Sequence, residues 1–136
     1  MPVDWESLPT EELLDVRMCE LGLTVTDTWL EDCVHRLREE LDDAGLRRFR
    51  VHTWLSDEWC SPDQVPGVGI PFYLAHPRLI RLERHIMLDV EGGTRSECMR
   101  LLRHEGGHAL QHADNQQRRK LWQRAFGKAS DPYPYF

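Results

Sequence analysis

One segment of the sequence constrains the fold more than any other, because it carries both the start signal and the length of a long helix. Residues 94–97 (Thr-Arg-Ser-Glu) have the spacing of a capping box, in which two side chains satisfy each other's backbone N–H groups. The break at residues 91–93 (Glu-Gly-Gly) comes directly before it. The spacing predicts a helix from Arg95 to about Ala125, closing at Gly127. Every pattern with a clear chemical role lies within this helix.

Apolar spacing predicts two further helices upstream. The longer one follows Thr26 or Asp27 and ends near Gly45. Its apolar stripe recurs at three-four spacing and consists of Leu30, Cys33, Val34, Leu37 and Leu41. A shorter helix is predicted from Thr10 to Gly22. Its inward residues are expected to be Leu13, Leu14 and Met18.

The middle of the chain favours strands. From Phe49 to Leu55 apolar and polar residues alternate, which is the pattern of a half-buried strand. The apolar stretch at 68–74 predicts a second strand, which Pro71 would place at an edge of the sheet. Residues 77–87 fit a short helix that opens with proline, although residues 86–90 also fit a strand.

Composition narrows the function classes. A chain of 136 residues fits one domain, residues 1–136, since domains cluster near roughly 100 to 150 residues. The net charge of −6 argues against nucleic acid as a partner. Apolar runs fall short of the roughly 18 to 20 residues of a membrane span, and the acidic N-terminus is unlike a signal peptide. We therefore expect a cytoplasmic protein that does not engage membranes, with its four cysteines as buried free thiols.

The predicted long helix contains the motif His104-Glu105-Gly106-Gly107-His108. Positions four apart lie one turn above each other on a helix, so both imidazoles can reach the same ion. In zinc hydrolases two neutral histidines and a third ligand hold the metal and leave one position open for water, whose proton a neighbouring carboxylate accepts. The motif predicts a zinc-dependent metallopeptidase that acts on a peptide or protein substrate. His104 and His108 would be the ligands and Glu105 the general base.

The two glycines of the motif support a functional interpretation. Each costs about 1 kcal/mol relative to alanine inside a helix. A purely structural helix has no reason to accept that cost. We expect Gly106 and Gly107 to let a neighbouring strand or the substrate approach the helix closely.

Five segments carry a resemblance that spans nearly the whole chain: WLSDEW at 54–59, IPFYLAHPR at 70–78, EGG at 91–93, RHEGGHA at 103–109 and FGKAS at 126–130. With these segments the chain resembles a family of bacterial zinc-binding metallopeptidases, related in outline to the zincins, which use a distant glutamate as third ligand. The resemblance implies an α+β, zincin-like fold, with N-terminal helices and a small mixed sheet packed against the active-site helix. It also implies that His104 and His108 bind Zn²⁺ and that Glu105 is the catalytic acid/base.

The sequence departs from that family at the third ligand, because Glu105 is its last glutamate. In the resembling proteins we expect the chain to continue, past the position equivalent to Phe136, into an acidic helix that supplies the third ligand. This chain is therefore either a fragment or a shortened, inactive relative. Asp114 has the spacing of an HExxHxxxxxD ligand, although Gln111 stands where that geometry has a glycine. His112 extends the histidine series, but three histidines on a straight helix cover about 12 Å, too far for one ion. We expect His112 to face solvent or to support the ligands.

Two other interpretations stay open. A catalytically inactive zincin-like module would bind a peptide or a partner protein by strand addition at an exposed sheet edge. Alternatively, the histidines could share a structural zinc with a second chain, and the acidic residues 1–46 and basic residues 115–136 would suit such a homo-oligomer. A Glu105→Gln substitution separates them from the enzyme, since only the enzyme depends on that carboxylate.

Overall fold

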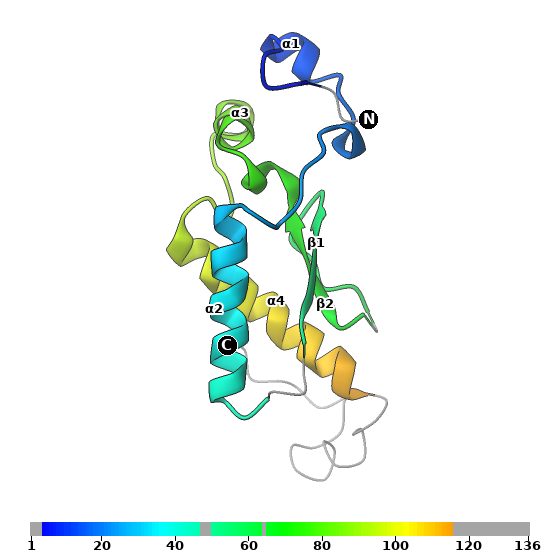
Figure 1. The fold of residues 1–136 in the computed structure, drawn as a ribbon, viewed down its shortest axis with the longest axis vertical. Helices are drawn as coiled ribbons and strands as arrows, with labels where there is room; N and C mark the ends of the chain where they lie inside the picture. Colours follow the sequence, from blue (N-terminus) through cyan, green and yellow to red (C-terminus); the bar gives the residue numbers. More distant parts are fainter. Residues whose placement is uncertain (1–3, 47–49, 64, 116–136) are drawn as a thin grey trace.

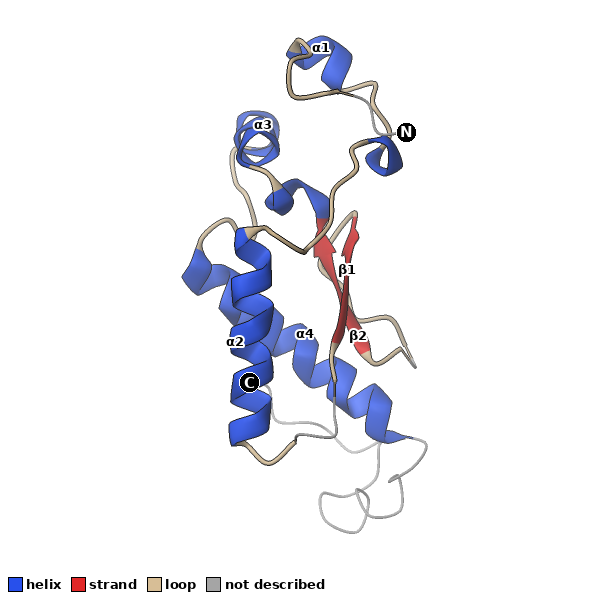
Figure 2. Ribbon diagram, in the orientation of Figure 1, coloured by secondary structure: helices blue, strands red, loops and turns tan. Residues whose placement is uncertain are grey.

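The computed structural model describes residues 4–46, 50–63 and 65–115. Its elements in chain order are α1 (Thr10–Leu13), the 3₁₀ helix η1 (Met18–Glu20), α2 (Trp29–Asp43), β1 (His52–Ser56), β2 (Gly67–Pro71), the 3₁₀ helix η2 (Phe72–Ala75), α3 (Pro77–Met87) and α4 (Arg95–Asn115). Figure 1 shows α2 and α4 crossing beside the two strands, with α1 and α3 at one end of the molecule. The mixture of helices and strands is the predicted α+β class (Figure 2). In the described ranges no helix has the length and apolar character to cross a membrane.

The sheet differs in detail from the predicted mixed sheet. β1 and β2 pair in parallel, beginning with His52 opposite Gly67. One antiparallel bridge joins Cys60 to Gly69 of β2, so the mixed character is limited to that bridge among the described residues. β2 is an edge strand, as predicted from Pro71, because the sheet has only two strands among the described residues. Pro71 itself is fully buried and ends β2. Proline cannot continue a ladder as a donor, and the chain turns there into η2.

The helix predicted from 26 or 27 begins slightly later. The Thr28 hydroxyl accepts a hydrogen bond from the Leu30 N–H at 3.2 Å and caps α2. Asp27 has a φ of 64°, outside the helical region, and its own N–H donates to the Glu31 carboxylate at 2.6 Å. The N-cap is therefore Thr28, one residue after the two positions predicted for it.

The main core lies where α2, the sheet and α4 meet, and it confirms the predicted apolar stripe. α2 contributes Leu30, Cys33, Val34 and Leu37, and the stripe's fifth residue, Leu41, is partly buried. Fully buried partners come from β2 and from α4, among them Ile70 and Leu102. Burying one such side chain contributes roughly 1.5–3 kcal/mol, so this contact fixes α4 against the sheet. The other buried members of the core are Val51, Val68, Leu74, Ala75, Val90, Cys98, Met99 and Ala109.

All four cysteines are free thiols, as predicted, but only Cys33 and Cys98 are buried. These two thiols interact with each other across the contact between α2 and α4. Burial raises the pKa of both, because the thiolate loses hydration in the core. Cys60 is half-buried and Cys19 is exposed.

The segment at 77–87, which fitted either a helix or a strand, forms α3. Pro77 occupies the first turn, and the Nδ1 atom of His76 caps the helix by accepting from the Arg78 N–H at 3.0 Å. The helix ends at Leu88, whose φ of 66° is left-handed. That conformation closes α3 and excludes the alternative strand at 86–90.

The predicted helix at 10–22 is largely wrong. Only Thr10–Leu13 are α-helical, and Met18–Glu20 form a 3₁₀ turn. Leu13 is buried as expected, whereas Leu14 and Met18 are 57% and 43% exposed. Tertiary contacts with α3, rather than a continuous apolar stripe, hold this segment.

Arg78 of α3 supplies the main polar contact with the N-terminal segment. Its guanidinium donates to the carbonyl oxygens of Trp5 and Glu6, at 2.7 and 2.5 Å, and to that of Leu8. The indole N–H of Trp5 in turn donates to the Leu21 carbonyl at 2.8 Å. A small second core forms beneath these bonds from Trp5, Leu13, Leu21 and Leu79.

Candidate metal centre

The helix α4 begins where the capping box predicts. The Thr94 hydroxyl accepts a hydrogen bond from the Glu97 N–H at 3.2 Å, and the Thr94 carbonyl accepts from the Cys98 N–H at 2.8 Å. From Arg95 the helix runs unbroken through the motif to Asn115, and its predicted continuation to 125 lies outside the described residues. Its buried face, which includes Leu102, Gly106 and Ala109, packs on α2 and β2.

The two histidines of the motif lie side by side on the outer face of α4. Both are exposed, and the ring centroids of His104 and His108 are 4.9 Å apart with an angle of 85° between the ring planes. Since a zinc–nitrogen bond is about 2.0–2.1 Å, the ring centre of a bound imidazole is about 3.2 Å from the ion, and a tetrahedral angle separates two such centres by about 5 Å. The observed spacing fits two imidazoles that share one ion.

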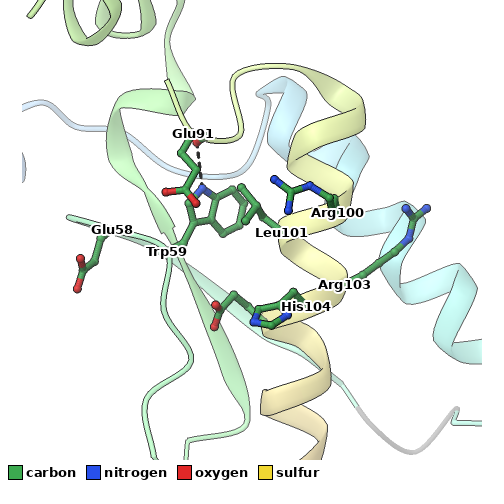
Figure 3. A pocket seen from close by; sticks show the side chains of 8 residues that line it. Glu58, Trp59, Glu91, Arg100, Leu101, Arg103 and His104 are labelled. Carbon is green, nitrogen blue, oxygen red and sulfur yellow. Dashed lines mark hydrogen bonds between the residues drawn. The ribbon is translucent and has the colours of Figure 1, made fainter. Parts of the chain in front are cut away.

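Glu105 and His104 line a cavity of about 660 Å³ beside α4 (Figure 3). Its other walls come from the loop after β1 and from the turn before α4. Glu105 is half-buried, while His108 is exposed one turn further along the helix. The remaining lining residues are Glu58, Trp59, Glu91, Arg100, Leu101 and Arg103.

Close approach of a strand, one of the two purposes predicted for the motif glycines, is not found among the described residues, while close approach of the substrate stays a prediction. A Cβ atom at Gly106 would lie 3.4 Å from Cδ2 of Leu37, an ordinary contact with a helix rather than with a strand. A Cβ atom at Gly107 would meet no atom within 4 Å. Packing among the described residues therefore does not require either glycine.

A third ligand is not found in the described part of the chain, where no group of three histidine, cysteine, aspartate or glutamate side chains is placed to hold a metal. The side chain of Asp114, the predicted third ligand, lies outside the described residues. The backbone at 114 belongs to the unbroken α4, and a straight helix places that position about 9 Å beyond His108 and on another face. The continuity of α4 therefore weighs against Asp114.

His112 supports the loop that follows β1 rather than facing solvent. Its Nδ1 atom is 3.5 Å from the Asp63 carboxylate, and its side chain is only 19% exposed. The contact joins the loop to α4 one turn beyond His108. The expectation that His112 faces solvent is therefore wrong, whereas its support of the metal ligands stays a prediction, because the contact described is with Asp63.

Arg103, the residue before the motif, forms an ion pair with α2. The Arg103 guanidinium donates to both carboxylate oxygens of Glu40, which also pairs with Arg36. Hydrogen bonding from Arg103 lowers the pKa of Glu40, and the same bond raises the pKa of Arg103. In Figure 3 the Arg103 side chain accordingly extends from α4 toward α2.

Three cavity residues outside α4 were not predicted from the sequence: Glu58, Trp59 and Glu91. All three lie in segments that carried the family resemblance, WLSDEW and EGG, for which no chemical role was apparent. The only signal available was that these segments contain acidic and aromatic residues, and their meeting with α4 depends on the tertiary fold.

Comparison with protein-family models, with curated proteins and with solved structures finds no match for this chain.

Proposed function

We propose that this protein is a zinc-dependent metallopeptidase of zincin-like fold, in which His104 and His108 bind the metal and Glu105 is the general base. The observation that carries the proposal is the 4.9 Å separation of the two exposed imidazoles, with Glu105 and His104 lining one cavity. A long motif helix packed against a small sheet also suits a zincin-like arrangement. The glycine at 107, which no described packing requires, is a further sign of selection for function.

The roles of the side chains follow from their chemistry. Zinc, when bound, supplies a Lewis acid that lowers the pKa of water and polarises a carbonyl group. Glu105 accepts the proton of the attacking water and returns it to the leaving amine. Its half-buried position beside Trp59 and Leu101 keeps the carboxylate in a partly dehydrated wall of the cavity, where it can reach a peptide lying there. Catalytic zinc sites have three protein ligands, so the proposal requires one more than the two histidines.

The test is zinc content, measured by elemental analysis at equal protein concentration, together with hydrolysis of a peptide mixture. Wild type is expected to hold about one zinc per chain, and His104→Ala and His108→Ala to lose it. His35→Ala is the matched control, since it removes an exposed imidazole from α2, outside the motif, and should retain zinc. Glu105→Gln should retain zinc and lose hydrolysis. Absence of zinc from wild type would overturn the proposal.

A second candidate is a catalytically inactive zincin-like module that binds an extended peptide. Two observations favour it: the lack of a third ligand in the described residues, and a groove of about 490 Å³ that Thr53, Trp54 and Leu55 of β1 line together with residues 23–26. A peptide added beside β1 would gain main-chain hydrogen bonds. Peptide binding that is unchanged in Glu105→Gln, without hydrolysis by wild type, would select this candidate.

A further inference from the structure

The cavity beside His104 has an aromatic wall accompanied by two acidic side chains. In Figure 3 the indole of Trp59 lies between Glu58 and Leu101 of α4, and Glu91 lies above it at the start of the 91–93 turn. These residues come from three separate segments that the fold brings around one cavity.

Trp59 is held firmly in this wall. Its indole N–H donates to the Glu91 carbonyl at 3.1 Å. The ring also packs on Gly92, where an added Cβ atom would lie only 2.8 Å from the ring atom Cζ2. Because Gly92 has a φ of +87°, the turn both requires glycine and leaves room for the ring. The side chain is thus fixed before any ligand arrives, which lowers the entropy lost on binding.

The carboxylates in the cavity have no cation committed to them. Glu58 and Glu91 are exposed, and within the described ranges neither carboxylate forms an ion pair or accepts a hydrogen bond. Arg103 is paired with Glu40, so Arg100 is the one arginine in the described lining that is not held by a partner. Since Glu105 adds a third negative charge, the acidic groups outnumber Arg100 in this cavity.

These carboxylates are not assembled as metal ligands. The described residues hold no group of three side chains that could bind an ion, although His104 and Glu105 line the same cavity. An aromatic face beside carboxylates is instead the arrangement that recognises an organic cation, through cation–π attraction and charge-assisted hydrogen bonds.

We infer that Glu58, Trp59 and Glu91 bind the side chain of a lysine or arginine residue of a peptide. The aliphatic stem of that residue lies on the indole, and its cationic end meets the two carboxylates. As a statement about substrate, the inference rests on the proposed function, and it gives the peptidase a preference for basic peptides. As a statement about binding, it stands on the cavity alone.

The experiment measures binding separately from cleavage. Fluorescently labelled pentapeptides, one with a central arginine and one with its uncharged isostere citrulline, are titrated with the full chain carrying Glu105→Gln, and fluorescence anisotropy is recorded. The arginine peptide is expected to bind about fivefold to tenfold more tightly. Glu58→Gln and Glu91→Gln, made in that background, should each reduce this preference by about threefold. Glu39→Gln, which removes the same charge from an exposed position on α2, is the matched control and should leave it unchanged.

Equal affinities for the two peptides, or no measurable binding of either at millimolar protein, would overturn the inference. So would a preference for arginine that survives in both Glu58→Gln and Glu91→Gln. An arginine preference that depends on these glutamates, in a protein that neither binds zinc nor cleaves peptides, would uphold the inference while removing the proposed function. The two proposals therefore fail by different measurements.

Discussion

The guanidinium of Arg103 meets the carboxylate of Glu40 in a two-point contact, with Nε 2.9 Å from Oε1 and Nη2 2.8 Å from Oε2. Arg103 directly precedes His104, and Glu40 belongs to α2. A paired contact of this kind fixes orientation as well as distance. It helps to set the rotation of α4 beside α2, and with it the direction in which the motif side chains leave the helix.

Glu40→Gln is expected to lower the free energy of unfolding at pH 7 by up to about 1 kcal/mol, because the pair is partly exposed to solvent. Arg103 lowers the pKa of Glu40 in the folded protein. The contribution is therefore complete above the ordinary glutamate pKa of about 4.3 and disappears as pH falls through the lower folded-state pKa. Urea denaturation at neutral and acidic pH measures the difference. A difference that did not shrink on acidification would contradict the pairing, and Glu39→Gln serves as control.

Gly107→Ala is expected to raise the free energy of unfolding by about 0.5–1 kcal/mol. Alanine is the better helix former, and the new methyl group would meet no atom within 4 Å. Thermal or urea denaturation measures the gain, with Gly106→Ala as a comparison in which the methyl group contacts Leu37. A loss of stability in Gly107→Ala would contradict the open surroundings of this position. Reduced peptide binding in a more stable variant would assign the glycine to function.

Gly92→Ala is expected to destabilise the fold by about 1–3 kcal/mol through two effects, a strained left-handed φ and a clash with Trp59. Gly45→Ala is the matched control, because Gly45 has a similar φ of +83° but open space around it. Denaturation measures the free energy of unfolding that each variant loses. The additional loss in Gly92→Ala relative to Gly45→Ala reports the contact with the indole. Equal losses in the two variants would mean that the ring moves away at no cost.

The thiols of Cys33 and Cys98 are expected to resist modification in the folded protein. Burial raises the pKa of both, so at neutral pH the two thiols stay protonated and are shielded from a reagent in solution. With DTNB, Cys19 should react quickly and the buried pair only after addition of denaturant. Quick reaction of all four thiols in native buffer would show that the contact between α2 and α4 opens readily.

Local signals in the sequence predicted the helices best. The Thr94 half of the predicted capping box and the apolar stripe of α2 rest on interactions within a few residues, and the structure contains both. The helix predicted from Thr10 failed because only Leu13 of its three expected inward residues packs in the second core with Leu79 of α3, while the other two are exposed. Periodicity alone cannot reveal that tertiary contact. The parallel pairing of β1 and β2 likewise depends on the path of the loop between them.

The site was predictable only along α4. The spacing of His104 and His108 follows from helix geometry, so four residues of sequence separation imply adjacent rings. Trp59 and Glu91 are 32 residues apart and meet only because the fold places the turn before α4 against the loop after β1. Their role in the cavity could not be inferred from spacing.

Synthesis from the N-terminus gives the Arg78 contact a further consequence. The carbonyl groups of Trp5 and Leu8 meet a guanidinium that belongs to α3, and α3 leaves the ribosome before α4. The N-terminal segment and α3 can therefore assemble before the motif helix has left the ribosome. Of the described elements, α4 emerges last and docks on partners that already exist. A wrongly docked α4 would displace His104 and His108 but would leave intact the small second core, which contains no residue of α4.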